Sequence, residues 1–456
     1  MENNILFDTY DTFLKNQEST IANVIEIDEE KVHWFFRGFK YPISSWPVVI
    51  NQKLTKSLEE VSAFVPSMLQ KIPALYFNNN INDIADFYFD GNKNKAKFSL
   101  MCHNKNVEVS CRLDLTYTED GFKVLEVNMG SSIGGMEFQN FEPLIKELHP
   151  ELQQPSNGNY YNSKKTQNIY VKFLVEKVLE FVTDVEEVNI FLVNDKNQDA
   201  HLKEMILGFY NDLLSSELQH RNKKGTVYSD RIDTLKFVNN QLTYQGNSVQ
   251  AVLILDFALV DITPAIFRAF INNKVYFPDH PGTMFVGDKR NLALLRRLAV
   301  NNKFEAAENA LILQYIPWTE IVEDVTVSYN GKSYEMLTLL RTHKDDFVIK
   351  ISDGLQGNNV FVGKFLSSHE WEKAISQSLE SKNYIAQKFS DSIALNAPNA
   401  KNEWIPHKLI WGAFGFGKTY GGTWVRMSAN KNDSGIINSA TGAVEAIVYE
   451  VHNKHE

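Results

Sequence analysis

The sequence is poor in cysteine, and this scarcity excludes several classes of protein. Among 456 residues there are two cysteines, Cys102 and Cys111. Their spacing fits no zinc or redox motif, and two thiols cannot build the disulfide framework of a small secreted protein. The first residues, MENNILFDTYDTFLK, carry mixed charge and lack the apolar core of a signal peptide. We therefore expect a cytoplasmic protein with two reduced, partly buried thiols.

An excess of basic residues and long apolar runs are also missing. Lysine and arginine total 46 against 56 acidic residues, which gives a formal net charge of −10. Because nucleic-acid binding needs a basic surface, we expect no nucleic-acid partner. No stretch of about 18 apolar residues is present, so we expect no membrane span. A chain of this length, without repeats or low-complexity segments, is predicted to form two or three packed subdomains.

Two segments early in the chain have the alternating pattern of β-strands. RLDLTY (112–117) and KVLEVN (123–128) alternate at period two, and the short gap between them suits a hairpin. On such a hairpin Asp114, Glu126 and Asn128 would converge as three oxygen ligands of the kind that Mg²⁺ prefers. Without this context, Glu126 and Asn128 would be interpreted as surface residues, which is the usual setting of such a pair on a strand.

Arg112 is predicted to share the face of Asp114, because side chains two apart on a strand point the same way. An arginine there can stabilise developing negative charge. The segment GSSIGG (130–135) follows the second strand. Its N–H groups and the hydroxyls of Ser131 and Ser132 are candidates for binding a substrate carboxylate. A flexible connector is the alternative interpretation of this segment.

Two lysines far downstream have settings that suit phosphate binding. Lys350 ends the run FVIK and precedes a glycine-containing loop. Its ammonium group could neutralise phosphate oxygens while the N–H groups of the loop bind them. Lys289 begins a predicted helix, where a cation opposes the helix dipole unless an anion lies nearby. The alternatives are a snorkelling lysine before a turn for Lys350 and a solvent-facing cation for Lys289.

The order of helical and strand patterns predicts the fold class, a combination of α+β and α/β parts. Residues 1–95 are predicted to be mostly helical, and 96–150 to contain the two strands described above. Strands alternate with helices over 166–282, which favours a small parallel sheet of Rossmann-like type whose last strand is KVYFPD (274–279). Residues 283–450 mix helices with antiparallel strands, as α+β lobes do.

Taken together, the motifs resemble those of circularly permuted ATP-grasp ligases, and in particular the synthetase domain of glutathionylspermidine synthase. The motifs are RLD, LEVN, DKRNLALL (288–295), FVIKISDGLQGNNV (347–360) and YGGTWVR (420–426), and the resemblance covers most of the chain. In an ordinary ATP-grasp enzyme the phosphate-binding lysines precede the metal-ligand strands. Here the metal-ligand strands come first, and this inversion makes the resemblance specific.

The resemblance implies an ATP-dependent carboxylate–amine ligase that acts through an acyl phosphate, with ATP and Mg²⁺ as cofactors. The implied partners are a small-molecule or peptide carboxylate and an amine, which the sequence does not identify. Arg112 would be catalytic, and Asp114, Glu126 and Asn128 would hold the metal. The residues implied in nucleotide binding are Lys289, Lys350, Gly354, Gln356, Gly357, Gln387 and Arg426. The alternatives are a plain core strand around Gln387 and a structural role for Arg426.

Three other functions have some support in the sequence or the resemblance. GAFGFGKT (412–419) matches the P-loop pattern, but a P-loop must open a helix, and the residues after Thr419 have a strand pattern. A catalytically silent ATP-binding protein of the same fold is the main alternative, against which the intact Arg–Asp–Glu–Asn set argues. Glutathionylspermidine synthase, whose synthetase domain the motifs resemble, also has an amidase domain with a catalytic cysteine. Too few residues precede Arg112 to form such a domain, so no amidase activity is predicted.

Overall fold

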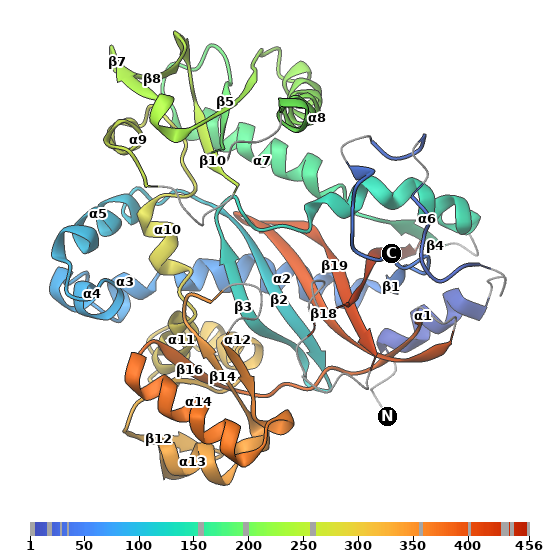
Figure 1. The fold of residues 1–456 in the computed structure, drawn as a ribbon, viewed down its shortest axis with the longest axis vertical. Helices are drawn as coiled ribbons and strands as arrows, with labels where there is room; N and C mark the ends of the chain where they lie inside the picture. The colour runs from blue at the N-terminus through green and yellow to red at the C-terminus, as the bar shows by residue number, and fades with distance from the viewer. Residues whose placement is uncertain are drawn as a thin grey trace.

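The computed structural model describes most of the chain. The described residues are 5–15, 21–27, 30–33, 36–153, 159–194, 200–255, 261–354, 359–399, 403–429, 437 and 442–453. They form a mixed α/β protein in which a large central sheet lies between two smaller units, each built on its own sheet (Figure 1). No helix among these residues is long and apolar enough to cross a membrane.

The large sheet collects strands from distant parts of the sequence. These are β1 (Val48–Ile50), β2 (Ser110–Thr118), β3 (Gly121–Met129), β4 (Asn159–Asn162), β17 (Leu395–Pro398), β18 (Trp404–Phe416), β19 (Thr419–Ala429) and β20 (Val444–Asn453). The strand order is β1-β20-β19-β18-β2-β3, with β17 beside β18 and β4 beside β20. The β1–β20 pair is parallel, and the other pairs are antiparallel. The predicted hairpin of β2 and β3 is therefore confirmed. Strand β18, which pairs with β2, lies almost three hundred residues further along the sequence.

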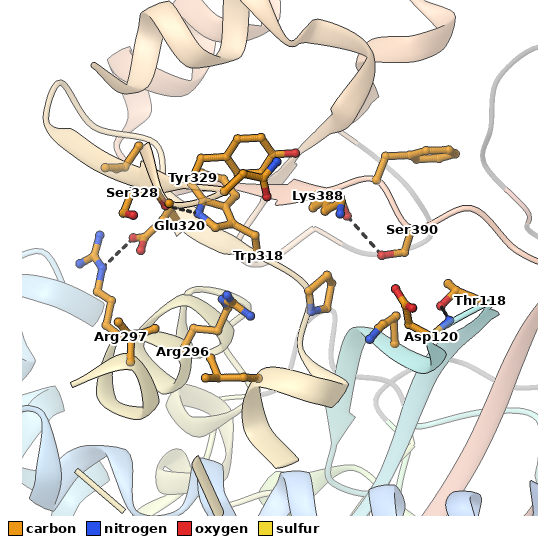
Figure 2. Close-up of a pocket in the computed structure, with 18 of the residues that line it drawn as sticks. Thr118, Asp120, Arg296, Arg297, Trp318, Glu320, Ser328, Tyr329, Lys388 and Ser390 are labelled. Carbon is orange, nitrogen blue, oxygen red and sulfur yellow. Dashed lines mark hydrogen bonds and ion pairs between the residues drawn. The ribbon is translucent and has the colours of Figure 1, made fainter. Parts of the chain in front are cut away.

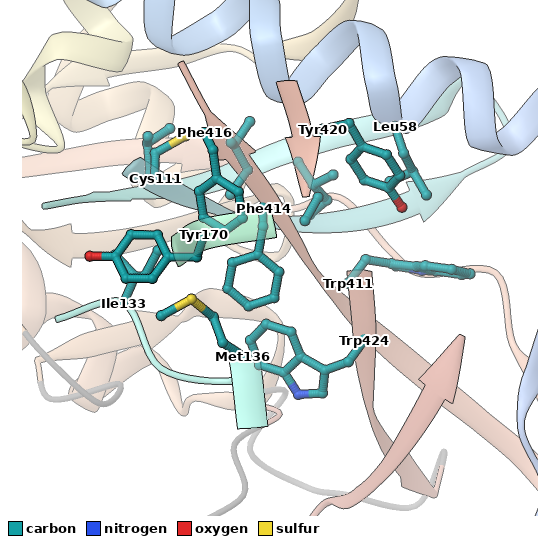
Figure 3. Packing of buried hydrophobic residues seen from close by; sticks show 14 of the residues in the cluster. Leu58, Cys111, Ile133, Met136, Tyr170, Trp411, Phe414, Phe416, Tyr420 and Trp424 are labelled. Carbon is teal, nitrogen blue, oxygen red and sulfur yellow. The ribbon is translucent and has the colours of Figure 1, made fainter. Parts of the chain in front are cut away.

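Different helices cover the two faces of the large sheet. Helix α2 (Gln52–Leu69) packs so closely on one face that a Cβ on Gly415 would lie 2.4 Å from the carbonyl oxygen of Ser62. Helix α7 (Thr166–Phe181) covers the other face, with the ring centroid of Tyr170 5.3 Å from that of Phe416. Figure 3 shows part of this packing, with Leu58 of α2 beside Tyr420, and Tyr170 near Phe416 among other apolar side chains. Successive side chains of β2 point to opposite faces of the sheet, so alternate residues face different helices.

The small unit in the C-terminal half is an antiparallel sheet, one face of which packs against two helices of the same unit. Its strand order is β11-β16-β14-β15, and a separate hairpin, β12–β13, lies beside it. The elements are β11 (Thr319–Ile321), β12 (Thr326–Tyr329), β13 (Lys332–Glu335), β14 (Phe347–Ile351), β15 (Val360–Val362), β16 (Tyr384–Lys388), α13 (Met336–Thr342) and α14 (Ser368–Ser381). Trp371 of α14 is buried and donates from its indole to the carbonyl oxygen of Leu340 at 2.8 Å, which fixes the two helices against each other.

The other small unit contains a three-stranded parallel sheet, as the alternation of patterns predicted. The order is β10-β5-β6. The elements are β5 (Ile190–Val193), α8 (Ala200–Gln219), β6 (Val227–Asp230), β10 (Ala251–Ile254) and α9 (Pro264–Ile271), with a small meander of β7 (Lys236–Val238), β8 (Gln241–Tyr244) and β9 (Asn247–Ser248). The strand predicted over 274–279 is wrong. Tyr276 forms only an isolated bridge to Ala251, and helix α10 (Pro281–Val286), capped by His280, begins soon afterwards.

The remaining helices lie mostly in the first third of the chain. They are α1 (Ile5–Lys15), α3 (Ile72–Leu75), α4 (Ile81–Tyr88), α5 (Lys93–His103), α6 (Glu142–Leu148), α10 (Pro281–Val286), α11 (Arg290–Val300) and α12 (Ala306–Tyr315). The prediction of helices before residue 95 fits 5–15 and most of 52–88. It fails over the described part of 21–47, which follows the edge of the large sheet through bonds such as Ser44 N to Glu445 O at 2.7 Å. The division of the chain into four domains stays a prediction.

The two cysteines are free and buried. Burial raises the pKa of both thiols to about 12. A thiol with so high a pKa is a poor nucleophile at neutral pH, so both cysteines are small apolar side chains of the core.

Candidate functional site

The β2–β3 hairpin brings four of the predicted residues side by side. Asp114 lies opposite Glu126, and Arg112 lies opposite Asn128. Arg112 Nε and Nη2 donate to the two carboxylate oxygens of Asp114 at 2.8 and 3.2 Å, as side chains two apart on a strand can. With its amide oriented to satisfy both neighbours, Asn128 links the same groups: its nitrogen donates to Glu126 at 3.1 Å and its oxygen accepts from Arg112 at 3.3 Å.

A second arginine reaches Asp114 from β19. Arg426 Nη2 lies 2.9 Å from Asp114 Oδ2. Burial alone would raise the pKa of Asp114, but Arg112 and Arg426 outweigh it and lower the pKa to about 2. Both guanidinium groups also lie over the indole of Trp424, at 5.3 and 5.6 Å from the ring centroid. Asp114 is therefore ionised at any physiological pH and held between two cations.

Lys289 joins this group from the start of helix α11. The lysine is the residue before the first helical turn, as predicted, and its backbone N–H donates to Ser352 O at 3.3 Å. Its Nζ lies 3.2 Å from Glu126 Oε1 and donates to Gly354 O at 2.7 Å. The lysine is 7% exposed, so it does not face the solvent as the alternative interpretation required.

Lys350 reaches the same hairpin from strand β14 of the small sheet. Its Nζ donates to Gln387 Oε1 at 2.7 Å and to Leu125 O at 3.3 Å. Burial and the nearby charge of Lys289 outweigh the attraction of Glu126, and the pKa of Lys350 falls to about 8. Gln387 is fixed in turn by a bond from its Nε2 to Thr319 Oγ1 at 3.2 Å. Gln387 is thus a positioning group for Lys350, a role that the sequence did not indicate.

The result is a compact group that we call the charged cluster. It consists of Arg112, Asp114, Glu126, Asn128, Lys289, Lys350, Gln387 and Arg426. The charged cluster contains four cations and two carboxylates. Because burying an excess of like charges costs free energy, a bound anion would stabilise it. The arrangement is chemically suited to holding a polyanion beside the two carboxylates.

The loop after β3 adjoins the cluster, but its serines have other contacts. Arg112 Nη1 donates to the carbonyl oxygen of Ile133. Ser132 Oγ donates to Leu255 O at 2.7 Å, and Ser131 is buried with its N–H donating to Asp279 Oδ1 at 2.7 Å. The substrate-binding role of both serines stays a prediction.

Asp279 is a structural residue that the sequence analysis missed. It is fully buried and accepts N–H donors from Ser131 and Ile254, which ties the loop after β3 to the end of β10. Burial outweighs these hydrogen bonds and raises the pKa of its carboxyl to about 6. The only signal in the sequence is a lone acid that directly follows the apolar run of 275–278.

Some predicted residues cannot be placed. Gln356 and Gly357 lie outside the described residues. Gly354 is described, and its carbonyl oxygen accepts from Lys289. The closing of this loop over a nucleotide stays a prediction.

The P-loop match is accidental, because its residues form a β-hairpin. Gly412 to Phe416 belong to β18, a turn follows at Gly417 and Lys418, and β19 begins at Thr419. Gly412 is needed for packing: a Cβ there would lie 2.0 Å from Trp424 Cζ3. The chain therefore has no phosphate-binding turn into a helix at this position.

A metal ion at the cluster would need a mixed set of ligands. Among the described residues, no three side chains of histidine, cysteine, aspartate or glutamate lie close enough to hold one. Two carboxylates and the amide of Asn128 are present, and hard oxygen atoms of this kind suit Mg²⁺, which takes further ligands from phosphate or water. The residues therefore fit such an ion, with fewer protein ligands than a dedicated all-protein site.

No family model matches the chain, and no curated protein matches it in sequence. Solved structures do match. A glutathione synthetase-like effector from Globodera pallida, in its apo form, has a TM-score of 0.59 at 14% identity, over 97% of this chain and 95% of that chain. A protein from Methylobacillus flagellatus KT, provisionally named a gamma-glutamylcysteine synthetase, has a TM-score of 0.41 at 9% identity, over 85% and 88% of the two chains. The chain therefore shares the fold of the first protein along nearly its whole length.

Proposed function

We propose that the protein is an ATP-dependent carbon–nitrogen ligase with a circularly permuted ATP-grasp fold. One observation carries the proposal. Lys289 and Lys350 lie more than 160 residues beyond the hairpin in sequence, yet both reach its second strand, at Glu126 and at Leu125. The match in fold to a glutathione synthetase-like effector supports the same class. A chance resemblance of short motifs would not require these two lysines to meet one hairpin.

The chemistry follows from charge and position. The substrate carboxylate attacks the γ-phosphorus of ATP, the bond to ADP breaks, and an acyl phosphate forms. The amine then attacks the acyl carbon, loses a proton, and expels phosphate. Such phosphoryl transfer depends on positioning and charge neutralisation. Lys289 and Lys350 would neutralise the phosphates, and Arg112 would stabilise charge on the transferred group.

Asp114, Glu126 and Asn128 would hold Mg²⁺, which supplies positive charge at the outer phosphates. Asp114 is ionised, and both carboxylates lie on neighbouring strands in register. Arg112 and Arg426 would keep Asp114 oriented. The identity of the acid and of the amine depends on residues outside this cluster.

The test is substrate-dependent release of ADP and phosphate by the purified protein with MgATP and a panel of acids and amines. Turnover should require an acid and an amine together. Glu126→Gln should abolish turnover and leave the circular dichroism spectrum unchanged, whereas the control Glu372→Gln, at an exposed pair with Arg341, should be fully active. Full activity of Glu126→Gln would overturn the proposal.

A catalytically silent ATP-binding protein is the second candidate, and one observation favours it. Both oxygens of Asp114 are engaged by arginines, Oδ1 by Arg112 and Oδ2 by both Arg112 and Arg426, so a metal ion must compete with two cations for this carboxylate. This candidate predicts that MgATP binds and is never consumed, with any pair of substrates. Calorimetry and the turnover assay on the same sample separate the two functions.

A further inference from the structure

A cavity of about 1310 Å³ lies apart from the charged cluster, between the tip of the β2–β3 hairpin, helix α11 and the edge of the small sheet. Figure 2 shows Thr118 and Asp120 of the hairpin tip on one side of it, with Trp318 and Arg296 on the other. Its edge strand is β11, which lies beyond β16 from the strand that carries Lys350. None of the described residues of the cluster lines it.

Four cations line this cavity, and one of them, Arg297, is paired with Glu320. The other three come from three different elements: Lys123 of β3, Arg296 of α11 and Lys388 of β16. Lys123 Nζ donates to Gln314 O at 2.6 Å, and Arg296 Nη1 donates to Ile316 O at 2.7 Å. Within the described residues, none of the three forms an ion pair. Burial, followed by the charges of Lys388 and Arg296, lowers the pKa of Lys123, although Asp120 acts in the opposite direction.

Two of the four acids that line the cavity form ion pairs with other cations. Glu320 is paired with Arg297 at 2.7 Å. Asp391 is paired with Lys408 and, at 3.5 Å, with Lys364. Glu119 and Asp120 sit on the exposed hairpin tip. Asp120 and Glu320 therefore offset part of the charge of Lys123 and Arg296. Within the described residues Lys388 has no ion-pair partner, and an anion bound near the three cations would lower the free energy of this arrangement.

The same cavity also has exposed apolar side chains. Val300, Leu313 and Val325 line it and are 60%, 37% and 39% exposed. Trp318 adds an aromatic wall, whose orientation is fixed because its indole donates to Ser328 O at 2.8 Å. Apolar side chains gathered around a few polar groups are typical of a small-molecule site.

We propose that this cavity is a second ligand site, for a small organic anion that carries a phosphate or carboxylate group on a flat apolar body. Arg296 gives one of its five N–H donors to Ile316 O and has others for the anion, in the planar arrangement that suits both phosphate and carboxylate. The apolar body would pack against Trp318. The site does not depend on the ligase proposal, because it shares no residue with the charged cluster.

The experiment uses the full chain and calorimetric titration with four probes: 1-naphthyl phosphate, 1-naphthoate, neutral 1-naphthol and inorganic phosphate. One or both of the naphthyl anions should bind, and which of them binds tighter separates phosphate from carboxylate recognition. Naphthol and phosphate alone should bind at least tenfold more weakly, since each supplies half of the interaction.

The variants locate the site. Arg296→Gln and Lys388→Gln should each weaken binding of the naphthyl anion roughly tenfold, because each removes about one charged hydrogen bond. Lys350→Met and the exposed Arg341→Gln should bind as the unchanged protein does. Because Lys388 is exposed, Lys388→Gln should fold normally, and it tests the site even if Arg296→Gln fails to fold. Unaltered affinity of the Lys388 variant, equal binding of naphthol, loss of binding in Lys350→Met, or no binding of either anion would overturn the proposal.

Discussion

Lys350 of β14 donates to Gln387 of β16 at 2.7 Å, and this bond fixes the lysine where the small sheet meets the β2–β3 hairpin. The two side chains point to the same face of their sheet, and the glutamine is 1% exposed. The bond satisfies a buried ammonium group without removing its charge. The lysine therefore stays available for an anionic ligand while its position is fixed.

Stability at alkaline pH should depend on Lys350. Its pKa of about 8 lies below the ordinary value of 10.5, so the unfolded chain binds more protons between these pH values. The free energy of unfolding should therefore rise with pH over this window, by up to roughly 3 kcal/mol from this residue. Denaturant unfolding of wild type and Lys350→Met between pH 7.5 and 10.5 measures it. The variant should lack this rise, and equal slopes for the two proteins would refute the assignment.

Asp114 should contribute strongly to stability. Asp114→Asn leaves Arg112 and Arg426 without their shared carboxylate, and removing one partner of a buried ion pair costs about 3–5 kcal/mol. Because the folded pKa of about 2 is depressed, the wild-type contribution should be complete above pH 4 and lost as the pH falls toward 2. Asp345→Asn, at a surface pair with Lys344, is the control and should change stability by less than about 0.5 kcal/mol. Equal effects of the two substitutions in urea unfolding would contradict the prediction.

Gly412 should not tolerate a methyl group. A Cβ there meets the Trp424 ring at 2.0 Å, and overpacking of this kind costs roughly 1–3 kcal/mol or more. Gly412→Ala should therefore lower the melting temperature. Gly38→Ala is the matched control, because its Cβ would meet no atom within 4 Å. A melting temperature unchanged in Gly412→Ala would mean that Trp424 is free to move.

Lys418 should be irrelevant to nucleotide binding, although it is the lysine of the P-loop pattern. It is exposed in the turn between β18 and β19. Under the proposed function, Lys418→Ala should bind MgATP as wild type does, whereas Lys350→Met should bind it at least about tenfold more weakly. Calorimetric titration of both variants with MgATP measures these affinities. Weaker binding in the Lys418 variant would restore the P-loop interpretation.

Local patterns were enough to predict the hairpin and its charged residues. Period-two alternation over 112–117 and 123–128 fixed which side chains share a face, and the register places Asp114 opposite Glu126. The helix start at Lys289 and the strand before Lys350 were equally local. That these lysines meet the hairpin was inferred from the resemblance, because no pattern within a segment reports on a contact more than 160 residues away.

Other features could not be read from the sequence for the same reason. The pairing of β4 with β20 depends on a strand at the other end of the chain, whereas the local composition of 153–165 is that of a loop. Asp279 has no motif around it, and its role arises from two N–H groups at Ser131 and Ile254. The cavity with Arg296 and Lys388 is formed by elements that lie far apart in sequence.

The neighbour relation of β2 and β18 has a consequence for biosynthesis. During translation the hairpin emerges with the outer edge of β2 unpaired. Strand β18, which pairs with that edge in the folded protein, is synthesised only near the end of the chain. Exposed strand edges can pair wrongly with other molecules, and contacts between distant segments form slowly. We therefore expect nascent chains to need protection by a chaperone until residue 416 has left the ribosome, and truncated products to aggregate.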